Sequence, residues 1–299
     1  MNLFITTSRG VYNYNLINDN ISQIIGNWNK GFFKKPSKGF FGISSNLNQN
    51  ELIFASREKL TKNVNYEKSS DSIVYFYNIL KRKFTNKIVV KNLFDIHQIT
   101  FFDNFVFLTE TGKNRIQVLN ILNSKIDYFI NIGDIRKDVN HINAINIDKN
   151  FFYIGLNNGH EKNEFKNAQI IKIPTDQVLK LKSFDALNYG NLINLNGVYH
   201  THDIEKFDDD YLISSSNLGK IYSLNTKKFI TDINPWTRGI ALGPNSIFIG
   251  KSGMGKRKSR HSRYYDGEIF ILDKSSLSFV KKIIIPKIGQ LNDIVYFKN

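Results

Sequence analysis

The chain has 299 residues, with 41 Lys+Arg against 26 Asp+Glu and a formal net charge of +15. A hydrophobic fraction of 41% and an aromatic fraction of 13% exclude a disordered chain, and the absence of cysteine excludes disulfides, thiolate metal sites and a cysteine nucleophile. No apolar run approaches the roughly 20 residues of a membrane helix, so no membrane span is predicted.

The positive charge is compatible with nucleic acid, an anionic membrane surface or small anionic substrates as partners. Its basic residues are spread along the chain, apart from a loop near residue 256, and this distribution does not favour nucleic acid. The first ten residues, MNLFITTSRG, lack the pattern of a secretory signal, and a cytoplasmic location is expected.

The elements predicted from the N-terminus onward are almost all strands. Residues 3–5 and 11–14 are short apolar runs separated by a turn at residues 8–10. Three further runs follow, at residues 39–43, 52–54 and 73–76. Only residues 175–181 have a helical pattern, which indicates an all-β protein.

Four segments superpose without a gap and indicate an internal repeat. They are HQITFFDNFVFL from His97, NAINIDKNFFYI from Asn143, HDIEKFDDDYLI from His202 and RGIALGPNSIFI from Arg238. Each has a polar first residue, an isoleucine two positions later, a turn and a second apolar run, which is the pattern of a β-hairpin. Another strand pair follows each hairpin, so the unit has four antiparallel strands, as a propeller blade does.

The spacing and the two ends of the chain give the number of blades. From His97 to Asn292, four repeats take about 49 residues each, which predicts about six blades for the whole chain. Residues 292–297 read as a first strand, and residues 3–5 and 11–14 as the second and third strands of the same blade. The prediction is a single all-β domain over residues 1–299, a six-bladed β-propeller closed by pairing of N- and C-terminal strands, with seven blades as the alternative. The predicted blades are residues 39–94, 95–138, 139–196, 197–234, 235–288, and 289–299 together with 1–30.

The repeated segments, among them FVFLTETGKNRIQVLNI and YLISSSNLGKIYSLN, resemble an uncharacterised bacterial family of six-bladed propellers. That family is distantly similar to the SMP-30/gluconolactonase and NHL propellers. The resemblance covers the chain from about residue 38 onward. It implies the fold and no particular activity, because propellers host enzymes and binding modules alike.

The repeat also predicts where a site lies. The first residues of the repeats, His97, Asn143, His202, Arg238 and Asn292, are called anchors below, and strand alternation predicts that all five face the central axis. His141 and His200 precede their anchors by two residues and are expected nearer the rim. Four of the six histidines would then lie on one ring with an arginine, a typical convergent polar site.

A divalent metal ion is the one cofactor that the sequence leaves open, with His97, Asn143, His202 and Asn292 as its ligands. The resemblance to the SMP-30-like enzymes implies a Glu, Asn and Asp set around the axis, but no anchor is a carboxylate. Asp203 and Asp293 follow their anchors by one residue, so alternation predicts that they point into the flank of the sheet.

The loops after the second strands are expected to surround the same opening. Substrate-binding candidates in these loops and beside the anchors are Arg9, Arg57, His141, His200, Trp236 and Lys251. The basic loop over residues 250–267 is expected to act as a cationic lid. Its GKSGMGK run mimics a phosphate-binding loop but lacks the required Ser/Thr and the following helix.

Two functions from different classes follow. The first is an enzyme acting at the channel mouth on a small anionic or sugar-like substrate, of lyase, epimerase or lactone hydrolase type. His97 and His202 would be its acid–base groups, Arg238 would hold the anion, and metal assistance stays open. The alternative is a non-catalytic binding module for a glycan, an anionic polymer or a protein.

Overall fold

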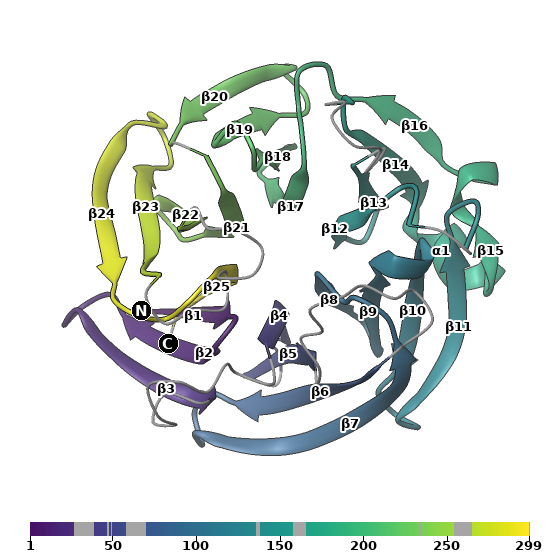
Figure 1. Ribbon diagram of the computed structural model, residues 1–299, viewed down its shortest axis with the longest axis horizontal. Coiled ribbons are helices and arrows are strands. Elements are labelled where there is room, and N and C mark those ends of the chain that lie inside the picture. Colours follow the sequence, from purple (N-terminus) through teal and green to yellow (C-terminus); the bar gives the residue numbers. More distant parts are fainter. Residues whose placement is uncertain are drawn as a thin grey trace.

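Six small sheets surround a central axis as the blades of a propeller (Figure 1). This computed structural model describes residues 1–26, 39–46, 48, 50–57, 70–135, 138–157, 166–233, 235–253 and 265–298. The prediction of an all-β, six-bladed propeller is confirmed, and the seven-bladed alternative is wrong.

Each blade is an antiparallel sheet whose first strand is innermost. Blade 1 consists of β25 (Leu291–Phe297), β1 (Asn2–Thr7), β2 (Gly10–Asn15) and β3 (Asn20–Gly26). Blade 2 consists of β4 (Gly39–Asn46), β5 (Glu51–Arg57), β6 (Ser70–Asn78) and β7 (Lys83–Leu93). Blade 3 contains β8 (Ile99–Phe102), β9 (Phe105–Glu110), β10 (Arg115–Asn120) and β11 (Lys125–Asn131).

The remaining blades follow in chain order around the ring. Blade 4 consists of β12 (Ile142–Ile147), β13 (Phe151–Leu156), β14 (Gln169–Pro174) and β16 (Asn191–Asn194). Blade 5 consists of β17 (Thr201–Phe207), β18 (Asp210–Ser215), β19 (Lys220–Ser223) and β20 (Lys228–Asp232). Blade 6 consists of β21 (Thr237–Leu242), β22 (Ser246–Ser252), β23 (Gly267–Asp273) and β24 (Phe279–Ile285).

The two ends of the chain share blade 1, as predicted. β25 pairs antiparallel with β1, with Ile5 opposite Ile294 and Asn2 opposite Phe297. The C-terminal strand is therefore the inner strand of a blade whose other three strands come from the N-terminus. This pairing closes the ring and removes two open sheet edges.

The long connection in blade 4 departs from the plain repeat. Helix α1 (Thr175–Leu181) lies where the helical pattern predicts it and buries Val178. The chain then adds β15 (Phe184–Asp185) parallel to β11, as a fifth strand of blade 3. In the described part of the chain, no helix has the length and apolar character needed to cross a membrane.

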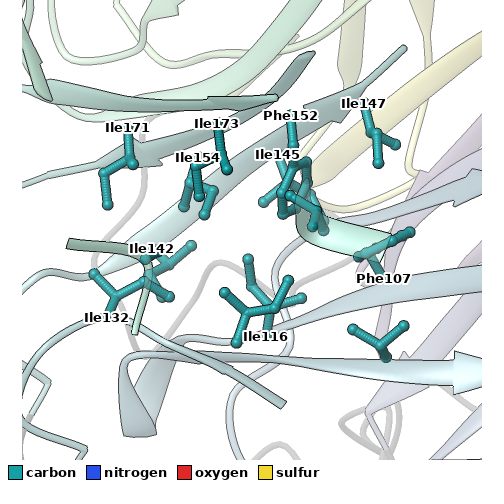
Figure 2. Packing of buried hydrophobic residues seen from close by; sticks show 14 of the residues in the cluster. Phe107, Ile116, Ile132, Ile142, Ile145, Ile147, Phe152, Ile154, Ile171 and Ile173 are labelled. Atoms are coloured by element: carbon teal, nitrogen blue, oxygen red, sulfur yellow. The ribbon is translucent and has the colours of Figure 1, made fainter. Parts of the chain in front are cut away.

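The apolar core lies between neighbouring blades. Between blades 3 and 4, Phe107 and Ile116 pack in one cluster with Ile145, Phe152 and Ile154 (Figure 2). Each of these five side chains is at most 1% exposed. Burying one such side chain contributes about 1.5–3 kcal/mol, so this packing holds each blade against the next.

At three of the six junctions between blades, the side chain directly after the anchor accepts from the backbone of the next inner strand. The backbone N–H of Ile145 in blade 4 donates to Gln98 of blade 3 at 2.6 Å. The N–H of Ile240 in blade 6 donates to Asp203 of blade 5, and that of Ile43 in blade 2 donates to Asp293 of blade 1 at 3.0 Å. We call these three contacts the junction hydrogen bonds; they connect alternate pairs of blades.

In the other three blades, the position equivalent to Gln98, Asp203 and Asp293 has a small residue: Gly42, Ala144 or Gly239. Gly42 has φ +63°, and a Cβ there would lie 2.4 Å from the backbone nitrogen of Ile99 in blade 3. Gly239 has φ +75°, and its Cβ would lie 2.8 Å from the backbone nitrogen of Ile294 in blade 1. These two junctions therefore depend on close backbone approach, for which glycine is needed.

We predict that Gly42→Ala destabilises the fold by about 3 kcal/mol, because it adds a backbone clash to the cost of a left-handed residue. Gly197→Ala is the matched control: Gly197 has φ +77°, but its nearest neighbour would be 3.7 Å away. The control substitution should lower the free energy of unfolding by about 1 kcal/mol. Urea unfolding measures both; equal losses would contradict the close-approach explanation.

Candidate functional site

The inner strands are bulged near their starts, where the anchors lie. In blades 2, 4, 5 and 6 the pairing register shifts at this point, for example between Thr201 and Ile204, and blade 1 has a matching shift opposite Asn292. The side chains of the second strand satisfy the freed amides: Thr109 accepts from the N–H of His97 and Ser214 accepts from that of His202. A bulge re-aims side chains, so simple alternation does not hold here.

Three imidazoles lie together at the anchor end of the axis. The ring of His97 lies 5.5 Å from that of His141 and 6.3 Å from that of His202. We call these three residues the histidine cluster. His97 also lies 6.3 Å from the ring of Phe41, the residue of blade 2 at the anchor position.

The contacts of His97 fix which of its nitrogens carries the proton. Nδ1 lies 3.1 Å from the carbonyl oxygen of Asp95 and 3.0 Å from the hydroxyl of Thr111. Because the Thr111 hydroxyl donates to the carbonyl oxygen of Ile142, both neighbours act as acceptors toward Nδ1. Nδ1 therefore carries the hydrogen, and Nε2 keeps the lone pair.

The surroundings keep His97 and His202 uncharged. Burial, opposed by Asp95 but reinforced by Arg57, His141 and Arg238, lowers the pKa of His97 to about 3. Burial and then Arg238 hold the pKa of His202 well below its usual value. Among the described residues, the ring nitrogens of His202 have no hydrogen-bond partner.

Arg238 lies beside these rings and is only 6% exposed. Its charge affects both His97 and His202, so the guanidinium lies close to both. In the amide orientation that satisfies both groups, the oxygen of Gln290 accepts from Nε and Nη2 of Arg238 at 3.2 Å. This contact orients the plane of the guanidinium.

His141 forms an acid–imidazole pair that the sequence prediction missed. Its Nδ1 lies 2.8 Å from Oδ2 of Asp138, whose side chain is 6% exposed. Such a carboxylate holds the imidazole in one orientation. The signal was weak, because Asp138 is an isolated acid three residues before His141.

A second set of equivalent positions lies two residues before the anchors. In four blades this position has a left-handed backbone, at Asp95, His141, His200 and Trp236, with φ of 59°, 46°, 53° and 76°. A bulky residue such as Trp236 is rare there, and such strain concentrates at functional sites. In blade 1 the same position is Gln290, so the alignment itself contained a signal for this residue.

The other residues predicted to bind substrate differ in whether they lie near the histidine cluster. Arg57 joins the cluster: it forms an ion pair of 2.5 Å with Asp95 and lies 4.1 Å over the ring of Phe41. His200 lies close enough to His202 to lower its pKa. Lys251, by contrast, pairs with Glu268 of its own blade at 3.4 Å.

Arg9 and the two asparagine anchors are buried near the inner strands. Arg9 is 9% exposed and its side chain lies beside Gly289. The amide of Asn292 donates to the carbonyl oxygen of Phe40 at 2.7 Å. Asn143 is 1% exposed, and neither of its side-chain polar atoms has a hydrogen-bond partner among the described residues. The basic loop predicted as a lid falls largely on residues 254–264, outside the described residues.

The expectation that Asp203 and Asp293 point into the sheet flank is wrong. Both line a central cavity of about 290 Å³, because the bulge shifts the alternation after each anchor. Burial raises the pKa of Asp203 to about 6, although its hydrogen bonds oppose the shift. Burial and the neighbouring Asp203 raise the pKa of Asp293 well above its usual value.

Glu205 faces the same cavity and was also missed. Burial and then the charges of Asp203 and Asp293 raise its pKa well above the usual value. One residue from each inner strand forms the wall of the cavity around Glu205. These residues lie two places after Gln98, Asp203, Asp293 and their equivalents in the other blades. Four neighbouring blades contribute polar residues and the next two contribute apolar ones: Ser44, Thr100, Asn146, Glu205, Ala241 and Val295.

The predicted metal ligands do not fit a divalent ion. No group of three or more His, Asp or Glu side chains suited to hold a metal is found within the described part of the chain. Of the four expected ligands, Asn292 is engaged with the backbone of Phe40, and Arg238 places a positive charge beside both His97 and His202. No chemical step is therefore derived through a metal.

Comparison with known proteins adds the fold alone. No family model and no curated protein matches the chain. The chain is similar to a chain in the crystal structure of a nidogen/laminin complex, with a TM-score of 0.64 and 10% identity over 98% of this chain and 97% of that one. It is also similar to a protein of unknown function from Bacteroides caccae, with a TM-score of 0.60 and 11% identity over the same shares.

We predict that His97→Asn changes how stability depends on pH. Between pH 6.5 and 3 the unfolded chain protonates His97 and the folded chain does not, so this residue lowers the free energy of unfolding as pH falls. Asparagine does not titrate, so the variant lacks this fall in the free energy of unfolding. From pH 7.5 to pH 5, the free energy of unfolding of the variant should therefore gain about 2 kcal/mol relative to wild type.

Denaturant unfolding at both pH values provides the measurement. The raised pKa values of Asp203, Glu205 and Asp293 have the opposite sign, but they are common to both proteins and cancel in the difference. A stability difference that stays constant with pH would show that His97 titrates normally in the folded protein.

Proposed function

We propose that the protein is an enzyme that moves a proton on a small anionic substrate bound at the histidine cluster. The observation that carries this proposal is the convergence of three imidazoles beside the buried guanidinium of Arg238, with the rings of His141 and His202 at 5.5 and 6.3 Å from that of His97. Convergent polar groups of this kind at a channel end are typical of a substrate site.

Arg238 is the proposed anion-binding group. A guanidinium can hold a carboxylate or phosphate through two parallel hydrogen bonds, and Gln290 already orients its plane. The net charge of +15 favours the approach of an anion.

The imidazoles have different proposed roles because their surroundings differ. His97 has Nδ1 fixed as a donor, so Nε2 is the atom that accepts a proton as general base. Burial is the main cause of the low pKa of His97, and Arg238 is the smallest contributor to it. A bound anion would offset the charge of Arg238 and favour a proton on the ring, so the pKa of His97 should rise when substrate binds.

His141 is the proposed general acid; the carboxylate of Asp138 holds its ring in place beside His97. His202 lies against His97 with ring nitrogens unengaged by the described residues, and we assign it hydrogen bonding to the substrate and relay of the proton. A base and an acid on one substrate suit a lyase, an epimerase or a lactone hydrolase.

One observation favours a second function, a non-catalytic binding module. A propeller of similar fold occurs in a complex of nidogen with laminin, so this fold is used in a protein–protein complex. A scaffold does not require three imidazoles in one cluster, and we rank it second.

We predict that Arg238→Ala weakens binding of inorganic phosphate or acetate by roughly ten- to a hundredfold, because a bidentate contact of this kind contributes about 1.5–3 kcal/mol. Arg238→Lys should restore part of the affinity, since it keeps the charge but loses the planar fork. Lys220→Ala, on the outer part of blade 5, removes the same charge away from the cluster and should bind as wild type does.

Isothermal titration of the four proteins measures these affinities. Equal affinity in all four, or no binding of either anion to wild type, would contradict the anion site. The histidine cluster would then be a structural feature of the channel, and the binding module would become the better explanation.

A further inference from the structure

A short loop of the same kind joins the third and fourth strands in five of the six blades. It spans residues 16–19, 79–82, 121–124 and 224–227 in blades 1, 2, 3 and 5, and residues 274–278, one residue longer, in blade 6. In each, the fourth residue has a left-handed backbone, with φ between 50° and 58°, at Asp19, Arg82, Ser124, Lys227 and Leu277. The third-to-fourth strand connection is thus a structural repeat of its own.

The residue before each loop holds it in place. The side chain of Asn15 accepts from the N–H of Ile17, and that of Asn120 accepts from the N–H of Leu122. Asp273 accepts in the same way from Ser275, whereas Asn78 and Ser223 accept from the N–H one residue further on, in Lys81 and Thr226. The loop conformation therefore depends on its capping and left-handed residues and not on the side chain at its second position.

That second position divides the blades into two groups. In blades 5 and 6 it is Asn225 and Ser275, as expected for an exposed turn. In blades 1, 2 and 3 it is Ile17, Leu80 and Leu122, which are 73%, 61% and 76% exposed. No other large hydrophobic side chain in the described ranges is as exposed as these three.

The three loops belong to consecutive blades (Figure 1). The strand directions place them on one face of the ring. In an antiparallel blade the third strand runs in the same direction as the inner strand. Since the inner strands start at the histidine cluster, the third strands end on the opposite face. Ile17, Leu80 and Leu122 consequently project from the face that is remote from the histidine cluster.

The surroundings of Leu80 are strongly basic. Lys81, Arg82 and Lys83 follow it directly, all are exposed, and none has an ion-pair partner in the described part of the chain. Residues 72–94 contain no acidic residue. Two lysines of blades 5 and 6 do have acidic partners: Lys274 pairs with Asp208 and Lys220 with Asp232.

We propose that Ile17, Leu80 and Leu122 dock the propeller on an anionic lipid bilayer, inserting into its headgroup region while the basic residues beside Leu80 contact lipid phosphates. A protein partner would need three separate pockets at matching positions, whereas a bilayer meets any set of side chains on one face. Aliphatic insertion combined with basic residues is the usual basis of peripheral membrane binding. The inference is independent of the proposed function; it leaves the histidine cluster facing the solution.

The test is flotation with vesicles of phosphatidylcholine alone and of phosphatidylcholine with phosphatidylserine. Wild type should bind the anionic vesicles. The triple variant Ile17→Asn, Leu80→Asn, Leu122→Asn copies the residue that blade 5 has naturally, so the loops should keep their conformation. It should bind the anionic vesicles at least about tenfold more weakly.

The matched control is Phe279→Asn, Val280→Asn, Ile284→Asn, which removes three side chains of 59%, 57% and 56% exposure from β24. It should bind as wild type does. Equal unfolding midpoints of the two triple variants and wild type establish that the comparison is between folded proteins. The variant Lys81→Gln, Arg82→Gln, Lys83→Gln should also lose affinity for the anionic vesicles, and salt should weaken wild-type binding.

Three outcomes would overturn the proposal. They are no binding of wild type to anionic vesicles, unchanged binding by the first triple variant, and equal losses in that variant and the β24 control. The first would leave an acidic protein as the partner of the basic loop. The second would mean adhesion by charge without insertion.

Discussion

The hydrogen bonds that cross from one blade to the next are the constraint on which the rest of this propeller depends. Each bulge frees backbone amides on an inner strand, and a buried amide without a partner costs about 1–3 kcal/mol. Gln98, Asp203 and Asp293 satisfy such amides on the following blade, and Gln98 donates to Asp203 at 2.7 Å across the axis. At two of the other three junctions Gly42 and Gly239 let the backbones meet directly. Hydrogen-bonded and close-approach junctions thus hold the inner strands of the ring together.

Two groups of titratable residues occupy the axis, and burial affects them in opposite ways. At the anchor end, burial and arginine charge keep His97 and His202 uncharged. Beyond the junction residues, burial and mutual repulsion favour protons on Glu205 and Asp293. A bound anion at the anchor end, or a bound cation at the other end, would shift these groups back toward their charged forms.

The sequence predicted the fold well because the repeat is regular. The gapless superposition from His97, Asn143, His202 and Arg238 located the inner strands, and the aromatic and β-branched runs located their partners. It predicted the site only in part, because an alternating pattern contains no sign of a bulge. Asp203 and Asp293 were for that reason placed in the sheet flank. Asp138 was missed although its partner His141 is only three residues away, because nothing in the sequence shows that the two side chains meet. Glu205 was missed because its role comes from burial and from the distant Asp293, neither of which an isolated acidic residue indicates.

The central claim is that the histidine cluster is an anion-responsive acid–base site, and imidazole NMR tests it most directly. Long-range ¹⁵N–¹H spectra, recorded across the acidic and neutral range with and without inorganic phosphate, report the tautomer and the protonation of each ring. The account predicts a neutral His97 with its hydrogen on Nδ1 when phosphate is absent. It predicts that the pKa of His97 rises when phosphate binds. A His97 that titrates as in a free peptide, or a pKa that phosphate leaves unchanged, would contradict it.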